Sequence, residues 1–205
     1  VDQNPTSDKN GEGTNVEVRT ESITGIIGAK LGESKNFQVY GGPVAQRVQA
    51  DVKLRGTAYE LANGYTTHIS SDQDYGWLAG VAYSKPEIAL KAALTYRSEI
   101  DHTTNSAESY PLPIIDGTPL SRSTPIDITP TVSLTIDFQT GINPTTLATA
   151  KVRWVPWSDF AIVPSLYNEV SAVNPAYGPD GLSLVSYDED QWQVELGLAK
   201  RLSPV

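Results

Sequence analysis

Cysteine and methionine are both absent from this sequence of 205 residues. Without cysteine the chain can form no disulfide framework, no thiolate zinc site and no iron–sulfur cluster, and it has no thiol nucleophile. Histidine is almost absent too, because His68 and His102 are the only two, so a metal centre built on several histidines is excluded. The sequence also has no apolar run near the ~18 residues of a membrane-spanning helix. These absences remove most metal- and thiol-dependent chemistry from consideration.

Basic side chains are scarce relative to acidic ones. The sequence has 15 lysines and arginines against 24 aspartates and glutamates, for a formal net charge of −9. A chain of this charge is a poor partner for a nucleic-acid backbone. It also lacks the glycine-rich loop that cradles a phosphate group. We therefore expect no nucleic-acid partner, no cofactor and no resident metal ion.

The sequence is instead rich in alternation between apolar and polar residues. In residues 88–101, the clearest case, Leu90 and Leu94 share one face while Lys91, Thr95 and Arg97 share the other. Because side chains of a strand point alternately to its two faces, the pattern predicts a β-strand, of about 45 Å at 3.2–3.4 Å per residue. Such a strand is far longer than the usual 5–6 residues.

The same alternation recurs at six further places, which gives about seven strands: residues 16–31, 44–55, 77–83, 131–139, 148–154 and 192–198. Two of the connections are tight turns, at residues 84–87 and 141–144. Three are long and polar, at residues 57–74, 103–127 and 165–190. Short turns on one side and long loops on the other are typical of an outer-membrane β-barrel.

Two fold classes are compatible with alternation alone. One is a soluble, secreted β-sandwich that serves as a binding module, with one face in a core and the other in water. The other is an antiparallel transmembrane β-barrel, which the strand lengths and the charged polar faces favour. Aromatic residues near the strand ends also favour it, since a membrane barrel has such girdles: Trp77, Tyr83, Tyr96, Trp154, Trp157 and Trp192. We therefore predict an all-β membrane barrel.

Two stretches resemble one family. The sequence DYGWLAGVAY at residues 74–83, followed by ALTYRSEI at residues 93–100, is similar to successive strands of the outer-membrane long-chain fatty acid transporters (the FadL/TodX group). Residues 137–141 and 152–160, which contain the pattern W-S-x-F, resemble the following hairpin of that family. The likeness covers about residues 74–160, and the flanking strands fit it more loosely.

The resemblance implies a monomeric, fourteen-stranded barrel in the outer membrane of a Gram-negative bacterium, in contact with its lipid and lipopolysaccharide. Such a barrel takes up long-chain fatty acids or other hydrophobic compounds by passive diffusion, with a lateral exit into the bilayer, and it is not an enzyme. The chain departs from the family in having about half the strands and no N-terminal hatch. Residues 1–205 are accordingly expected to be one partial barrel domain.

A transporter of this kind needs polar anchors rather than catalytic groups. A carboxylate head group would be held by cations that face the barrel interior, and Arg97 and Arg55 are our first candidates. The other candidates are Arg47, Lys53, Lys91 and Arg153. The alternative is that these cations pair with interior carboxylates and stiffen the wall, as Arg97 could with Glu99 or Asp51.

Gly41, Gly42 and Pro43 are a candidate gate, because proline cannot donate to the strand ladder and glycine weakens it. In the family such a kink forms the lateral exit, although a simple bulge or turn would give the same sequence.

Two further alternatives remain open. His102, near Ser98 and Asp101, could form part of an outer-membrane hydrolase site, or it could simply lie at a solvated strand end. The acidic residues 72–76 and 188–190 could bind a divalent cation through oxygen ligands, or they could be solvated turns.

Overall fold

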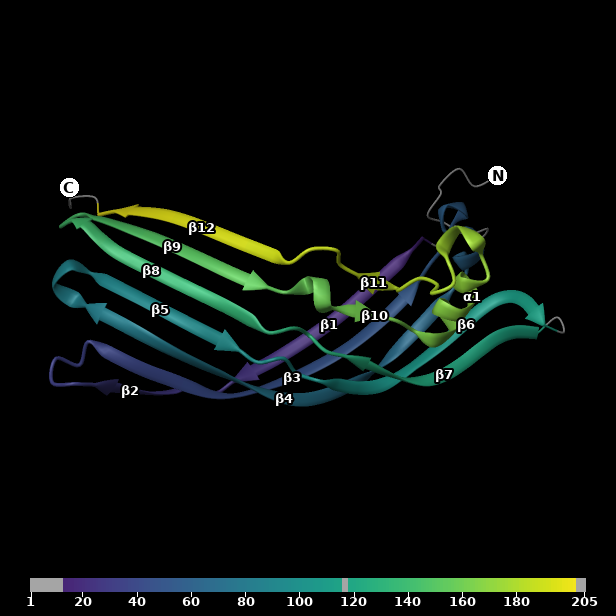
Figure 1. Cartoon of the computed structure of the whole chain (residues 1–205), viewed down its shortest axis with the longest axis horizontal. Helices are drawn as coiled ribbons and strands as arrows, with labels where there is room; N and C mark the ends of the chain where they lie inside the picture. The colour runs from purple at the N-terminus through teal and green to yellow at the C-terminus, as the bar shows by residue number, and fades with distance from the viewer. Residues whose placement is uncertain (1–12, 116–117, 202–205) are drawn as a thin grey trace.

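Long antiparallel strands form one curved sheet in the computed structural model, which describes residues 13–115 and 118–201 (Figure 1). The sheet has ten strands. Their bounds are β1 Asn15–Thr24, β2 Ile27–Leu31, β3 Phe37–Lys53, β4 Thr66–Lys85, β5 Leu90–Arg97, β6 His102–Ile115, β7 Thr118–Ile128, β8 Ser133–Asn143, β9 Thr146–Val155 and β12 Gln191–Lys200.

Three of these strands continue a neighbour in the same line, so the sheet has the order β1-β3-β4-β5-β8-β9-β12 across its width. β2 continues β1 along β3, and β6 continues β5 along β4. In the next line of the sheet, β8 continues β7: β7 pairs with β6, and β8 pairs with β5. The prediction of an antiparallel barrel sheet is confirmed: the strands curl into a half-barrel.

The sheet divides along its length into two parts. We call the turn half the part made of β2, β5, β8, β9, β12 and the segments of β3 and β4 that pair with β2 and β5. The helix half is made of β1, β6, β7 and the remaining segments of β3 and β4. In Figure 1 the tight turns lie at one end of the sheet, and the helix α1 lies at the other end.

The smaller elements belong mostly to the helix half. The 3₁₀ helix η1 (Thr57–Ala62) joins β3 to β4, and η2 (Pro86–Ile88) joins β4 to β5. The connection from β9 to β12 holds η3 (Trp157–Asp159), β10 (Ala161–Ile162), α1 (Ser165–Ala172), η4 (Pro175–Tyr177) and β11 (Val185–Ser186). The part of the chain that the structure describes contains no helix that could span a bilayer.

The helix half contains the hydrophobic core. One cluster joins Val52 of β3, Tyr110 of β6, Leu54 and Tyr65 on either side of η1, and Leu166 and Val170 of α1. A second cluster joins Ile69, Ile126 and Ile128, with Phe160 and Ile162 packed against it. The connection between β9 and β12 therefore folds back over the sheet and buries one of its faces.

Two of the three predicted long loops are wrong. Residues 57–74 include the first part of β4, and residues 103–127 form most of the β6–β7 hairpin. A β-bulge explains the first error, because Val48 pairs with Asp72 while Ala50 pairs with Ile69. One extra residue on β4 moves the following side chains to the other face, and the alternation of the sequence breaks there.

The predicted strand over residues 88–101 is also interrupted. It begins only at Leu90, after η2, and regular structure ends at Arg97 before resuming at His102. Ala89 has a positive φ of 51° at the end of η2, which lets the chain turn from β4 into β5.

Candidate functional site

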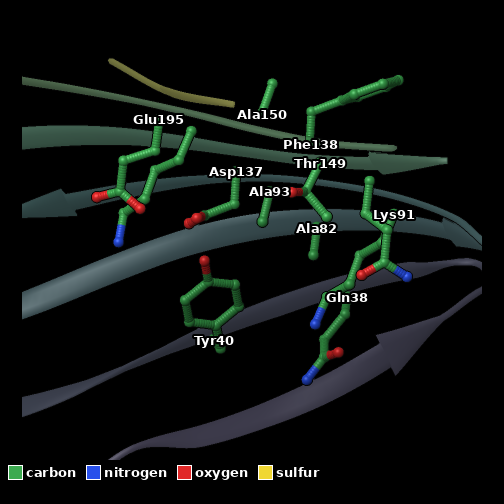
Figure 2. Close-up of a pocket in the computed structure, with 12 residues that line it drawn as sticks. Gln38, Tyr40, Ala82, Lys91, Ala93, Asp137, Phe138, Thr149, Ala150 and Glu195 are labelled. Atoms are coloured by element: carbon green, nitrogen blue, oxygen red, sulfur yellow. The ribbon is translucent and has the colours of Figure 1, made fainter. Parts of the chain in front are cut away.

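The concave face of the turn half carries a polar hollow of about 500 Å³ (Figure 2). Its side chains come from β3, β4, β5, β8, β9 and β12, and in Figure 2 those of Gln38, Tyr40, Lys91, Asp137 and Glu195 surround one common space. The hydroxyl groups of Tyr40 and Thr95 are 2.6 Å apart, which fixes the ring of Tyr40 against this wall. The concave face here is thus lined by polar and charged groups of both signs.

A basic cluster lies next to this hollow. Arg97, Lys151 and Arg153 line a smaller recess of about 240 Å³ together with Thr95, Ser133 and Thr135. The Nη2 of Arg97 is buried and has no hydrogen-bond partner in the structure. Because a buried donor without a partner is unfavourable, this atom is available to a ligand oxygen. Asp137 and Glu195 pair in register with Lys151 and partly balance its charge.

The six predicted anchors do not share one face. Lys91, Arg97 and Arg153 line the concave hollow and recess described above. Arg47, Lys53 and Arg55 alternate with the buried residues Val48, Val52 and Leu54 and belong to the convex side of the helix half.

Arg55 has a local structural role at the end of β3. Its Nη1 donates to the carbonyls of Leu54 and Tyr65 at 2.9 and 3.0 Å, and its Nη2 donates to Thr66 Oγ1 at 3.1 Å. Arg47 donates through Nε to Ser71 Oγ at 2.5 Å. The contacts of Arg55 hold the ends of the segment that contains η1, and the contact of Arg47 holds the β-bulge in β4. Both arginines therefore lie away from the concave hollow.

The convex face of the turn half is apolar and exposed. Val81 on β4, Leu94 on β5 and Ile136 on β8 have exposed fractions of 53%, 41% and 47%, and they lie in one register row across these strands. On β12 the same face presents Trp192, Val194, Leu196 and Leu198, all more than 60% exposed. β12 is ten residues long, which is within the 9–11 residues that a tilted strand needs to cross a bilayer. The strand length and the exposed apolar face thus both suit hydrocarbon as the surrounding solvent.

Aromatic side chains bound this apolar band. Tyr96, Trp154 and Trp192 belong to one register row on β5, β9 and β12, in which Leu134 of β8 links the first two. The rings of Trp77 and Tyr96 are 5.3 Å apart, and those of Trp154 and Trp192 are 6.3 Å apart. Nearer the tight turns, Phe37 and Tyr83 pair with rings 4.9 Å apart. Such rows are typical of the two interfaces of a membrane.

The convex face of the helix half has the opposite polarity and carries exposed polar pairs. The concave face is largely buried under α1 and β10, where polar side chains such as Thr67 and Ser106 lie among the two apolar clusters. His68 Nδ1 is 2.6 Å from Asp51 Oδ1, and Thr103 Oγ1 donates to Asp127 Oδ1 at 2.9 Å. The polarity of the convex face therefore reverses, from apolar to polar, where the helix half begins.

The candidate gate lies close to this reversal. Gly25 N donates to the carbonyl of Pro43 at 3.1 Å, but Pro43 has no N–H to return the bond. The register runs unbroken from Thr24–Val44 to Ile27–Gly41, so the segment is neither a bulge nor a turn. Gly42 approaches the neighbouring strand so closely that a Cβ on it would be 1.8 Å from the carbonyl oxygen of Gly25. The ladder is thus weakened between two strands that remain in contact.

His102 does not form the suggested hydrolase site. The side chain is completely buried, with Nδ1 3.0 Å from Asp72 Oδ2 and Nε2 3.4 Å from Gln46 Oε1. Ser98 instead donates to the carbonyl of Glu99 and accepts from the N–H of Trp77. His102 is therefore a buried polar group of the wall rather than a solvated strand end.

The acidic segments do not gather into a metal site. Asp72 and Asp74 lie within β4 rather than in a loop. Among the described residues no group of three or more histidines, aspartates or glutamates is placed to hold a metal ion.

Sequence reasoning missed the carboxylate that fixes α1. Glu108 on β6 is 2% exposed and accepts hydrogen bonds from the N–H of Tyr167 at 2.9 Å and from the hydroxyl of Tyr65 at 3.3 Å. Arg122 on β7 donates to Glu169 on α1 at 2.5 Å. Burial raises the pKa of Glu108, although its hydrogen bonds oppose the shift. The one sequence signal for the burial of Glu108 is the alternation of residues along β6. That signal was not used, because residues 103–127 were expected to form a loop.

Removal of this carboxylate should loosen α1. We expect Glu108→Ala to lower the stability of α1 packing by about 1–3 kcal/mol, because the N–H of Tyr167 loses its acceptor. Because its pKa is raised in the folded state, Glu108 binds a proton more readily when folded. Its contribution should therefore rise as pH falls from neutral toward the ordinary glutamate pKa.

Hydrogen–deuterium exchange of the α1 amides at pH 7 and pH 5 measures both effects. Glu108→Gln is the matched control, which keeps the shape and should remove the pH dependence. Equal protection of α1 in the wild type and Glu108→Ala would contradict this role.

The geometry defines a class: an antiparallel half-barrel with an apolar, aromatic-bounded convex band and a polar concave wall. No family model and no curated protein sequence matches the chain. Solved structures do match it. The toluene transporter TbuX of Ralstonia pickettii has 13% identity and a TM-score of 0.59, over 97% of this chain and 57% of that one.

Two other solved structures agree with this fold. A FadL homologue of Pseudomonas aeruginosa has 14% identity and a TM-score of 0.60, over 92% of this chain and 47% of that one. The CymD monoaromatic hydrocarbon channel has 11% identity and a TM-score of 0.59, over 94% and 59%. The fold is thus that of the FadL/TodX-like barrels, as the sequence resemblance predicted, and the chain spans about half their length.

Proposed function

We propose that this chain forms part of the wall of an outer-membrane β-barrel through which hydrophobic small molecules diffuse passively. The observation that carries the proposal is the reversal of polarity along the sheet. An apolar convex band in the turn half suits hydrocarbon, and the polar convex face of the helix half suits the aqueous exterior. A soluble β-sandwich would leave Leu94, Ile136 and Leu196 in water without a cover.

This proposal fixes an orientation. The turn half lies within the bilayer and the helix half projects outside the cell, beside lipopolysaccharide. The edge strands β1 and β12 each pair with one neighbour among the described residues. Since an open edge is unfavourable in lipid, we propose that further strands close the barrel as a monomer.

Detergent dependence tests the membrane assignment. We expect the protein to stay in solution only with detergent and to float with liposomes in a density gradient after reconstitution. A monodisperse protein in plain buffer, with no flotation, would contradict it.

The proposed cargo is a long-chain fatty acid or a related hydrophobic compound. The named solved structures include a toluene transporter and a monoaromatic hydrocarbon channel, which supports apolar cargo of more than one shape. Burial of an acyl chain contributes ~0.8 kcal/mol per methylene, so passage needs no other energy source. The polar hollow on the concave face would receive the head group.

For a cargo with a carboxylate, Arg97, Arg153 and Lys91 are the proposed anchors. Arg97→Ala with Arg153→Ala should weaken laurate binding about tenfold or more, because a hydrogen bond to a charged group contributes ~1.5–3 kcal/mol. Isothermal titration calorimetry in a non-ionic detergent measures the affinity. Arg47→Ala is the matched control on the convex face, and equal affinities for both variants would exclude the concave anchors.

The weakened ladder at Gly41, Gly42 and Pro43 is the proposed lateral exit. An apolar depression on the surface at this point is lined by Ile27, Ala29 and Val39 together with the two glycines. Cargo that leaves here would pass from the concave face directly into the bilayer.

A further inference from the structure

Charge is divided unevenly between the two ends of the sheet. The tight-turn end consists of residues 30–36, 85–89, 143–145 and 200–201, which lie together at one end of the molecule in Figure 1. These residues include two carboxylates, Glu33 and Glu87. They also include five cations: Lys30, Lys35, Lys85, Lys200 and Arg201. All seven charged residues are exposed.

The opposite end has the opposite charge. The connection between β9 and β12, residues 156–190, contains no lysine, arginine or histidine. Its charged residues are six carboxylates: Asp159, Glu169, Asp180, Asp188, Glu189 and Asp190. Because the whole chain has a formal net charge of −9, the excess of cations at the tight-turn end does not follow from the overall composition. The charge of this end suits an anionic partner.

The protein itself does not neutralise these cations. The ion pairs among the described residues lie in the helix half, as between Arg122 and Glu169. Within the described part of the chain, none of the five cationic side chains of the tight-turn end has a hydrogen bond or an ion pair. In the polar hollow, by contrast, Lys151 pairs in register with Asp137 and Glu195. The cations of the tight-turn end are therefore available to an external anion.

Two of these cations lie on the convex face, just past the apolar band. Lys85 follows Tyr83 by two residues on β4. Lys200 follows Leu198 by two residues on β12. Because alternate residues of a strand share a face, both lysines continue the apolar face toward the turns. Two residues of strand span ~6–7 Å, so Lys85 lies about that far beyond an aromatic residue that bounds the band.

This position suits the head-group region of a bilayer. A lysine can lay its aliphatic stem along apolar surface and keep its ammonium group in polar surroundings. Two further cations adjoin the pair. Ser84 N donates to the carbonyl of Asn36 at 2.8 Å, which brings Lys35 next to Lys85, and Arg201 directly follows Lys200. The apolar face thus ends in two pairs of cations at the depth of the lipid phosphates.

We propose that the tight-turn end binds the phosphate groups of anionic glycerophospholipids in the periplasmic leaflet of the membrane. This inference rests on the proposed function, which places the turn half in the bilayer and the helix half outside the cell. Lipopolysaccharide also carries phosphate, but on that orientation it lies beside the acidic end. A zwitterionic lipid offers a phosphate together with an ammonium group that the lysines repel. A lysine near an anionic membrane surface strengthens the attraction about fivefold, so a lipid with net negative charge is preferred.

Electron paramagnetic resonance of spin-labelled lipids tests this preference. The protein is reconstituted in phosphatidylcholine vesicles with a trace of phosphatidylglycerol or phosphatidylcholine that carries a nitroxide on its acyl chain. The fraction of each probe that is motionally restricted at the protein surface is then compared. We expect the wild type to select phosphatidylglycerol about twofold or more over phosphatidylcholine. In about 1 M salt, where the Debye length is ~3 Å, the selection should disappear, and selection that persists would count against a site built on charge.

Charge removal at the two ends locates the site. Lys85→Gln with Lys200→Gln should remove most of the selection for phosphatidylglycerol. Arg47→Gln with Lys53→Gln is the matched control, because it removes the same charge from exposed residues of β3 in the helix half, and it should keep the selection. Unchanged selection by the Lys85 and Lys200 variant, or a loss confined to the control, would overturn the proposal.

The same spectra separate this site from the proposed function. If neither probe were motionally restricted, the placement of the turn half in a bilayer would be refuted, and this site with it. If both probes were restricted to the same extent by the wild type, the membrane placement would stand and the head-group site alone would be refuted.

Discussion

Leu94→Arg should destabilise the folded barrel in a lipid bilayer by about 2–4 kcal/mol, the cost of a cation near the midplane of a barrel's lipid face. Leu94 is 41% exposed on the convex face, between the aromatic rows that contain Tyr83 and Tyr96. Reversible urea unfolding in lipid vesicles, followed by tryptophan fluorescence, measures the free energy.

The matched control is one residue away in the same strand. Ala93 lines the concave hollow and pairs in register with Asp137, so Ala93→Arg places the same cation opposite a carboxylate in a hydrated space. We expect a change below about 1 kcal/mol. Equal destabilisation by the two substitutions would contradict the assignment of faces in β5.

Gly42→Ala should be strongly destabilising for so small a substitution. Its Cβ would lie 1.8 Å from the carbonyl oxygen of Gly25, which is backbone and cannot rotate away. The strands must separate, and overpacking of this kind costs ~1–3 kcal/mol and occasionally more. The free energy of unfolding in vesicles should fall by about 3 kcal/mol, near the top of that range.

Gly25→Ala, at the same kink, serves as its control. A Cβ there would meet only Pro43 Cγ at 3.9 Å, an ordinary contact, so the variant should fold with nearly unchanged stability. If both alanine variants were equally stable, the close approach of the two strands would not exist. The pair also tests the proposed exit, because only Gly42→Ala should alter the rate of cargo release.

The turn half could be predicted from sequence because its environment is simple. Lipid on one face and water on the other impose strict alternation, and residues such as Lys91 and Leu94 fall on the faces that their polarity indicates. The short connections after Lys85 and Asn143 were visible as turn sequences for the same reason.

The helix half could not be predicted as well, because its polarity depends on a distant segment. In β3, Val48 and Val52 alternate with Arg47 and Lys53, as apolar and polar residues do in a lipid-facing strand. Here, however, α1 and β10 cover the face that carries the valines, so the apolar face of this segment is the concave one. Alternation along a strand predicts that its two faces differ in polarity, but it does not indicate which face is concave. The anchors Arg47, Lys53 and Arg55 were assigned to the interior for that reason.

The burial of Glu108 and the cluster of tyrosines beside it depend on the same long connection. Tyr167 and Tyr177 are separated from Tyr59 and Tyr110 by more than fifty residues, and only the return of the chain over the sheet brings the four rings together. No local motif marks such a site.

Spin-label accessibility tests the reversal of polarity most directly, and the cysteine-free sequence allows single labels without background. Labels at Val81 and Gln49 lie on the convex face of the turn half and the helix half, respectively. In reconstituted vesicles we expect molecular oxygen to relax the label at Val81 more strongly, and a water-soluble nickel chelate to relax the label at Gln49 more strongly. Equal access of the nickel chelate to both labels would contradict the reversal of polarity.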